Sequence, residues 1–173
     1  MVRHHPATVV TRVRIPVDAL DMFFDADFKA KGTDWKKFED DVAQLFVQFD
    51  YDVEQDLRLN KPRRFQIDLI AHDRDRCFII DCKDHSYISP GREEDFINNQ
   101  VARATALVTK RKEIGQKKIF VLLVTRNRSS SLLKYDSLGG KIYGVDIKSL
   151  PDLLRNLDLY EDALLSISDK HYT

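Results

Sequence analysis

The chain has 173 residues, of which 43% are hydrophobic and 32% charged, a composition typical of one soluble domain with a well-filled core. It contains two cysteines, Cys77 and Cys82, within a single strand-like run, a spacing that argues against a mutual disulfide. The absence of paired histidines nearby argues against a zinc site. No apolar run approaches the roughly 18 residues of a membrane helix, and the N-terminus lacks an apolar signal region, so we expect a cytoplasmic protein that does not enter membranes.

Charge is unevenly distributed along the chain, although 28 basic and 28 acidic residues give a formal net charge of zero. Residues 57–135 hold 17 Lys and Arg against 9 Asp and Glu, a balance of +8, which the flanks offset with −8. A local positive field is what phosphate backbones require. Any single basic cluster is equally well explained as ordinary solvated charge, but together they make nucleic acid a candidate partner.

Composition and breaks divide the chain into three parts. Residues 1–32 form an N-terminal extension of unclear role, in which residues 9–15 alternate like a strand and the acidic stretch 18–27 predicts a short helix. A Gly-Thr-Asp sequence then marks a break and a helix start. We expect the main domain over residues 33–160 and a C-terminal tail over residues 161–173.

The first helix of the main domain is predicted over residues 34–49. Its apolar stripe consists of Trp35, Phe38, Val42, Leu45, Phe46 and Phe49. At about 100° per residue, Glu39 lies within this stripe, whereas Asp40 and Asp41 point away. A carboxylate on a core-facing stripe is costly unless it is paired or metal-bound, which makes Glu39 a candidate ligand. The alternative is a glutamate at the edge of the stripe that reaches solvent.

Two apolar runs that are typical of neighbouring strands each carry an acid where a buried strand should carry none. Residues 65–71 contain Asp68, and residues 77–83 end in Asp-Cys-Lys. Because strand side chains alternate between faces, Asp81 and Lys83 point the same way. A polar turn between the runs predicts a hairpin. Two carboxylates and a lysine at a strand end are the parts needed to hold a hard divalent cation and activate a water.

The remaining pattern places further elements around this hairpin. Residues 51–54 read as a strand, 92–113 as a long helix, 118–125 as a strand buried on both faces, 142–147 as another strand, and 149–157 as a closing helix. A long helix between strands implies a crossover and a parallel pair. We therefore predict an α/β fold, with a central mixed β-sheet of four to five strands flanked by helices on both faces.

The Asp-x-Lys tripeptide is not specific by itself. The chain contains four of them, which begin at Asp27, Asp34, Asp81 and Asp146. Only the one at Asp81 has an acid on an upstream neighbouring strand, Asp68, and a core-facing Glu39 on the preceding helix. The constellation is therefore informative where the tripeptide is not.

This constellation resembles the PD-(D/E)xK nuclease superfamily, also called restriction endonuclease-like, over about residues 33–157. The closest likeness is to its Mrr-like branch, with the archaeal Holliday junction resolvases as near relatives. Residues 35–43 resemble the first-helix motif, residues 66–70 the strand with the first acid, and residues 80–83 the strand with the second acid and the lysine. The resemblance implies the restriction endonuclease-like fold.

Further positions match or depart from that family pattern. Gln100 stands where the Mrr-like branch has a glutamine on the following helix, and residues 149–154 match the closing helix. No proline directly precedes Asp68, and residues 61–65 replace the usual glycine-rich approach. Neither departure removes a residue that the chemistry requires.

The resemblance implies a metal site made of oxygen ligands. Asp68 and Asp81, with the backbone carbonyl of Cys82, would ligate Mg²⁺, for which Mn²⁺ would substitute. Glu39 would hold a metal-bound water or a second ion. The metal would neutralise charge on the scissile phosphate and lower the pKa of a bound water.

The resemblance also implies catalytic roles for two further side chains. Lys83 would orient or deprotonate the attacking water and offset charge in the transition state, and Gln100 would position Lys83 or the phosphate. An alternative stays open, in which Asp81 and Lys83 are only a buried ion pair on the sheet.

The expected function is a Mg²⁺-dependent DNA endonuclease of the Mrr-like restriction or repair type, acting on double-stranded or branched DNA. One alternative is a Holliday junction resolvase, which would act as a homodimer. Another is a nuclease-fold module that binds nucleic acid or a partner without cutting. The sequence does not determine which DNA shape or base sequence is preferred.

Overall fold

A computed structural model of the chain describes residues 8–9, 35–60, 63–83, 93–126, 133–135, 140–160 and 166–167. Most of the N-terminal extension, including the helix expected over residues 18–27, lies outside the described residues. So does most of the tail expected over residues 161–173. Of the strand expected over residues 9–15, only Val9 is described, within the short strand β1 (Thr8–Val9).

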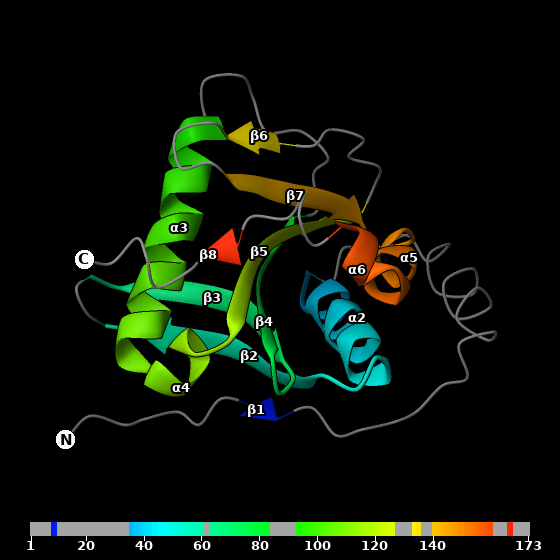
Figure 1. The fold of residues 1–173 in the computed structure, drawn as a ribbon, viewed down its shortest axis with the longest axis horizontal. Coiled ribbons are helices and arrows are strands. Elements are labelled where there is room, and N and C mark those ends of the chain that lie inside the picture. The colour runs from blue at the N-terminus through cyan, green and yellow to red at the C-terminus, as the bar shows by residue number, and fades with distance from the viewer. Residues whose placement is uncertain are drawn as a thin grey trace.

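The main domain follows the predicted order of helix, three strands, helix, strand, strand and helix, with four further short elements. The elements after β1 are α2 (Trp35–Gln48), β2 (Asp52–Leu59), β3 (Phe65–His72), β4 (Arg76–Lys83), α3 (Glu93–Lys110), α4 (Lys112–Gly115), β5 (Lys118–Thr125), β6 (Leu133–Tyr135), β7 (Gly140–Asp146), α5 (Leu150–Arg155), α6 (Leu157–Tyr160) and β8 (Ser166–Ile167). In the ribbon of Figure 1 these labels run from blue to red along the chain.

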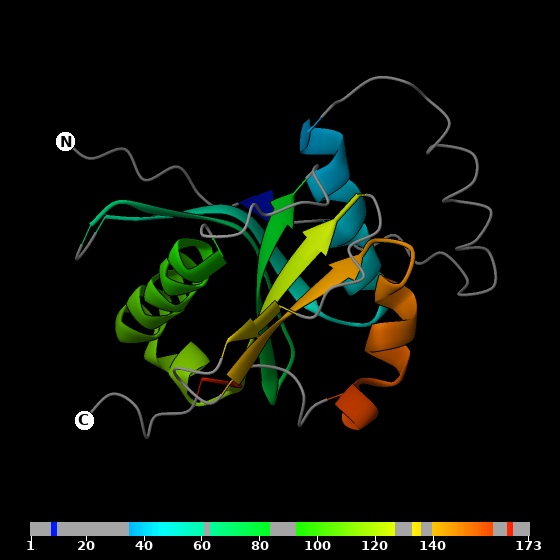
Figure 2. The ribbon, with the colours of Figure 1, turned by 90° about the horizontal axis from the view of Figure 1, so that it is seen from above.

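The sheet is mixed, as the sequence predicts. Its order is β1-β2-β3-β4-β5-β7-β6, with β8 paired to the start of β5. Strands β1 to β4 are antiparallel neighbours, whereas β4, β5 and β7 are parallel. Helix α3 makes the crossover that the parallel β4–β5 pair requires. Figure 2 shows α3 and α4 on one face of the sheet and α2 and α5 on the other, which confirms the predicted α/β fold class.

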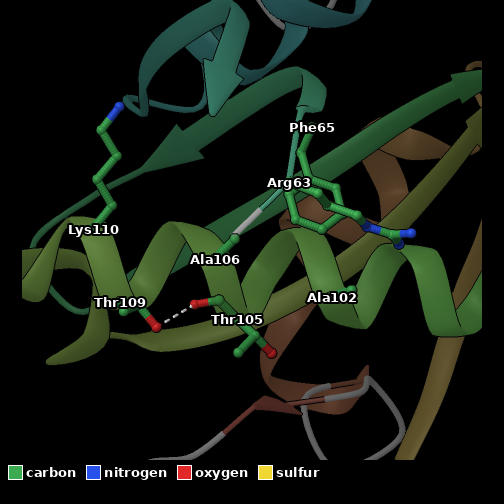
Figure 3. Close-up of a pocket in the computed structure, with 7 residues that line it drawn as sticks. All are labelled: Arg63, Phe65, Ala102, Thr105, Ala106, Thr109 and Lys110. Carbon is green, nitrogen blue, oxygen red and sulfur yellow. Dashed lines mark hydrogen bonds between the residues drawn. The ribbon is translucent and has the colours of Figure 1, made fainter. Parts of the chain in front are cut away.

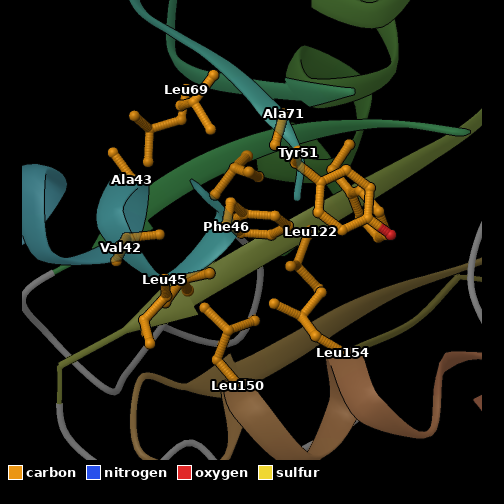
Figure 4. Packing of buried hydrophobic residues seen from close by; sticks show 14 of the residues in the cluster. Val42, Ala43, Leu45, Phe46, Tyr51, Leu69, Ala71, Leu122, Leu150 and Leu154 are labelled. Atoms are coloured by element: carbon orange, nitrogen blue, oxygen red, sulfur yellow. The ribbon is translucent and has the colours of Figure 1, made fainter. Parts of the chain in front are cut away.

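Each face of the sheet buries its own apolar core. The core on the α2 side contains Phe46, Phe78 and Phe120, with Leu150 from α5 closing one end. The rings of Phe78 and Phe120 are stacked with centroids 5.2 Å apart. Figure 4 shows side chains from α2, the sheet and α5 converging in this core. Because both faces of β4 and β5 are covered, their sequences are nearly continuous apolar runs.

Two element boundaries differ from the sequence-based prediction by three residues or more. Strand β2 continues to Leu59, five residues beyond the predicted end at residue 54, because its polar residues pair with β3 in an exposed hairpin. The long helix ends at Lys110, not near residue 113. Arg111 leaves the helical conformation with φ −123° and ψ 86°, and its guanidinium pairs with Glu54 on β2.

The alternating side chains of β2 and β3 switch from one face of the sheet to the other, and the switch occurs at the same position along both strands. Phe65 and Ile67 pack into the core under α3, whereas Leu69 and Ala71 pack into the core under α2. A regular strand keeps such alternate residues on one face, so β3 twists between residues 67 and 69. The facing residue of β2, Asp56, has φ 51°, in the left-handed region that aspartate tolerates. This irregularity lies at Asp68.

Candidate active site

The carboxyl end of β4 carries a buried acid and a half-exposed lysine on the same side of the strand. The Asp81 side chain is 3% exposed, whereas that of Lys83 is 42% exposed. Lys83 Nζ lies 2.9 Å from Asp81 Oδ2, which confirms the alternation argument. The Lys83 ammonium also lies 5.9 Å from the ring centroid of Phe96 on α3. The lysine is therefore held from two elements at the surface end of the strand.

Asp68 reaches β4 through its side chain. Its Oδ2 accepts a hydrogen bond from the backbone N–H of Cys82 at 2.9 Å. The regular pairing between β3 and β4 ends at Leu69 and Ile80. The Asp68 carboxylate therefore accepts from the Cys82 N–H, which the backbone pairing with β3 leaves available. Burial raises the pKa of Asp68, and the nearby negative charge of Asp81 raises it further. The two strand acids predicted to converge are brought together.

Glu39 approaches the same region from α2. Trp35 Nε1–H donates a hydrogen bond of 2.6 Å to Glu39 Oε1. Burial raises the pKa of Glu39, and the charge of Asp68 is the next largest cause of that rise. Cys82, buried beneath, has its thiol pKa raised by burial and then by the charges of Asp68, Asp81 and Glu39. The charges of all three acids therefore act on Cys82 of β4.

Gln100 is a buried polar residue of α3, with 2% of its surface exposed. It lies one helical turn after Phe96, whose ring neighbours Lys83. Its burial places it on the side of α3 that is turned away from solvent. Its expected contact with Lys83 or with a phosphate stays a prediction.

Arg103 is a member of the cluster that the sequence reasoning missed. Its Nη1 donates to Asp81 Oδ1 at 2.6 Å, and its side chain is 25% exposed. A signal was present, since Arg103 follows Gln100 by three residues and therefore shares its helix face. Only the packing of α3 against β4 shows that this face meets Asp81.

The oxygen donors fit a hard cation such as Mg²⁺, although they do not enclose one. Asp81 Oδ2 is buried and makes no hydrogen bond among the described residues, so its contact with Lys83 is purely electrostatic. Within the described ranges, no three His, Cys, Asp or Glu side chains are grouped as a metal site. Mg²⁺ is commonly held by one or two carboxylates together with waters and substrate phosphates, which Asp68 and Asp81 match.

The cluster lies where parallel strands end together. Lys83 of β4 pairs with Thr125 of β5, which pairs with Asp146 of β7. Ligands of open α/β sheets bind outside such carboxyl ends. Asp146 itself caps a turn, accepting hydrogen bonds from the backbone N–H groups of Lys148 and Ser149. The tripeptide that begins at Asp146 therefore forms a turn after β7.

A separate apolar groove lies between α3 and the start of β3. It has a volume of about 770 Å³ and is lined by Arg63, Phe65, Ala102, Thr105, Ala106, Thr109 and Lys110. Figure 3 shows Arg63 and Lys110 at opposite ends of its small-residue floor. The Arg63 guanidinium lies 4.7 Å from the centroid of the Phe65 ring and donates to Asn99 Oδ1 at 2.9 Å. None of the clustered acids lines this groove.

Comparison with known proteins identifies the domain. A family model described as a nuclease-related domain, NERD, matches residues 34–135, more than half of the chain. The match includes Glu39, Asp68, Asp81, Lys83, Gln100 and Arg103. No curated protein matches the chain. None of the helices in the described ranges has the length and apolar character needed to span a membrane. The chain therefore belongs to the nuclease-related domain family, a member of the PD-(D/E)xK-like nuclease superfamily.

Proposed function

We propose that this protein is a Mg²⁺-dependent endonuclease that hydrolyses phosphodiester bonds in DNA. The observation that carries the proposal is the convergence of Asp68, Asp81 and Lys83 at the carboxyl end of β4. Buried acids of this kind cost folding free energy, so their grouping needs a compensating role. Membership of a nuclease-related family supports phosphodiester chemistry as that role.

The proposed metal site uses the residues in distinct ways. Asp68 and Asp81, with the backbone carbonyl of Cys82, would hold Mg²⁺ or Mn²⁺, and Glu39 would hold a metal-bound water or a second ion. When bound, the metal supplies positive charge to the scissile phosphate and lowers the pKa of a coordinated water. Burial, followed by the charge of a neighbouring acid, raises the pKa values of Asp68 and Glu39, and a bound cation would offset this cost of ionisation.

Lys83 would supply the proton chemistry. Its ammonium is tethered to Asp81 and Phe96 yet is 42% exposed, so it reaches solvent where a phosphate would lie. In this position the ammonium would orient the attacking water and offset charge in the transition state, and Lys83 would deprotonate the water only as the neutral amine. Gln100, buried on the neighbouring helix, would position Lys83 or the phosphate.

The DNA contact would follow the basic β2–β3 hairpin and the exposed side of α3. Arg58, Arg63, Arg64 and Lys110 are exposed there, on the segment whose sequence balance is +8. Phosphate contacts of this kind fix the register of a duplex without reading its sequence. They support binding to DNA in general. The Mrr-like restriction or repair type and the Holliday junction resolvase are narrower forms of the same proposal, to be separated by substrate.

A second candidate function is favoured by one specific contact. Asp81 pairs with both Lys83 and Arg103, an ion-pair network also expected of a nuclease-fold module that binds DNA or a partner without cutting. Such a module needs no cation site. Calorimetric titration with Mg²⁺ separates the two functions, because only the nuclease requires binding.

The decisive experiment is a cleavage panel with Mg²⁺ and with Mn²⁺. Its substrates are linear duplex, methylated duplex, single-stranded, flap and four-way DNA, and the Asp81→Ala protein controls for contaminating nucleases. We expect cleavage of at least one substrate by the wild-type protein and none by the variant. Preference for four-way DNA together with a dimer in solution would identify a resolvase. Cleavage at equal rates by both proteins would refute the site, and no cleavage with no Mg²⁺ binding would favour the binding module.

A further inference from the structure

Both carboxylate oxygens of Asp81 face a cation. Arg103 Nη1 lies 2.6 Å from Oδ1, and Lys83 Nζ lies 2.9 Å from Oδ2. The acid is almost fully buried, so its charge is screened by these two partners and not by water. A divalent ion that binds Asp81 must therefore share this carboxylate with two positive charges or displace one of them.

The two partners differ in how they are held. Lys83 is on β4 beside Asp81 and also contacts the Phe96 ring, which keeps it at the strand end. Arg103 reaches across from α3 on a long flexible stem, and among the described residues its side chain donates to Asp81 Oδ1. Its planar guanidinium also suits bidentate contact with a phosphate, which an ammonium does not match. Arg103 is therefore the partner to be exchanged.

We propose that Arg103 holds Asp81 in the metal-free protein and moves to a phosphate oxygen of the DNA when a divalent cation takes Asp81 Oδ1. This inference rests on the proposed nuclease function and adds a phosphate-binding residue that responds to the metal. The exchange keeps the buried acid neutralised at every stage, first by Arg103 and then by the cation. It also releases a guanidinium beside the scissile phosphate only when the metal is in place.

The test measures Mg²⁺ binding without DNA, by calorimetric titration of the wild-type and Arg103→Gln proteins. Removing the competing positive charge should tighten Mg²⁺ binding by about tenfold, within the range by which residues around metal ligands alter affinity. Arg111→Gln is the matched control, since Arg111 makes an equally short 2.6 Å pair with Glu54 and has a similar exposure of 26%. Its Mg²⁺ affinity should equal that of the wild type.

A second variant keeps the test valid if Arg103→Gln does not fold, as judged by thermal denaturation in chelator. Arg103→Lys retains the charge but not the planar fork, so its Mg²⁺ affinity should stay near wild type while kcat for DNA cleavage falls. Wild-type metal binding with equal or weaker binding by Arg103→Gln would overturn the exchange and leave the nuclease proposal intact. Absence of Mg²⁺ binding by the wild type would overturn both.

Discussion

The side chain of Asp68 joins β3 to β4 through a 2.9 Å hydrogen bond to the backbone N–H of Cys82. This contact orients the first strand acid toward the second, Asp81, whose charge disfavours the ionised form of Asp68. One hydrogen bond therefore fixes the position of a carboxylate that the folded protein holds with an unfavourable charge. The contact that orients Asp68 toward Asp81 therefore places its charge where ionisation lowers the stability of the folded protein.

Asp68→Asn should stabilise the metal-free protein at pH 7. The pKa of Asp68 is raised on folding, so its ionisation opposes folding above the ordinary carboxyl range, and this penalty is absent when the pH lies below that range. Asparagine removes the charge yet retains an oxygen to accept from Cys82. The free energy of unfolding, measured by urea denaturation in chelator, should exceed that of wild type at pH 7. The difference should shrink as the pH falls toward 3.8, the ordinary value.

Mg²⁺ should reverse this ranking. A ligand that binds only the folded state raises Tm, so wild-type protein should gain stability on addition of Mg²⁺. Asp68→Asn should gain little and should cut no DNA. If Asp68→Asn were less stable than wild type in chelator at pH 7, burial and the charge of Asp81 would not be what makes ionised Asp68 unfavourable.

Lys83→Met should abolish cleavage while preserving Mg²⁺ binding. General acid–base groups contribute typically about 10²- to 10⁴-fold to rate, so kcat should fall by that order. Methionine keeps the apolar length of the side chain beside Phe96. Lys148→Met is the matched control, because Lys148 occupies the same place in another Asp-x-Lys tripeptide but follows a turn at Asp146. Equal kcat in wild-type and Lys83→Met proteins would exclude Lys83 from the reaction.

Arg64→Ala should weaken DNA binding without sequence preference. Arg64 is exposed between β2 and β3, where a phosphate contact is expected. Loss of one such contact should lower the slope of log affinity against log salt by about 0.9. Fluorescence anisotropy with a labelled duplex at several salt concentrations measures the slope. Arg155→Ala on α5, whose guanidinium pairs with Asp152, provides the control and should leave the slope unchanged. An unchanged slope for Arg64→Ala would show that Arg64 in the β2–β3 hairpin does not contact a DNA phosphate.

Phe78→Ala should cost about 3–5 kcal/mol in free energy of unfolding, as expected for a large aromatic removed from a packed core. Phe78 is fully buried, and its ring centroid lies 5.4 Å from those of Phe46 and Tyr51 and 5.2 Å from that of Phe120. Urea denaturation measures the loss. Leu159→Ala, at a residue 81% exposed, should change it by less than about 0.5 kcal/mol. Similar losses in the two variants would contradict the core assignment.

Much of the fold follows from local pattern. The continuous apolar run of β5 predicts a strand covered on both faces, and its bounds, Lys118–Thr125, match the structure. The alternation rule places Lys83 beside Asp81, and the helical stripe places Glu39 on the side of α2 that approaches Asp68. These predictions depend on periods of two and 3.6 residues, which the sequence displays directly.

The remaining features depend on contacts between distant segments. Arg103 shares a helix face with Gln100 in the sequence, but it meets Asp81 only because α3 crosses over β4. The extension of β2 past residue 54 depends on pairing with β3. The switch of side chains between the faces of the sheet occurs where Asp56 has a positive φ. The apolar groove requires Phe65 and Ala106 to face one another across two elements. Such features arise from packing and not from residue order.

The antiparallel order of β2, β3 and β4 has a consequence for how the chain reaches its native state. These strands follow one another in sequence, so the strands that carry Asp68 and Asp81 are joined by a short loop whose closure costs little entropy. Strand β5 and Arg103 join only after the longer crossover segment. The two acids should therefore meet before Arg103 arrives to neutralise Asp81. Until Arg103 arrives, Lys83 on the same strand is the cation beside Asp81, so the lysine that serves the proposed chemistry also lowers the repulsion between the two acids while the meander forms.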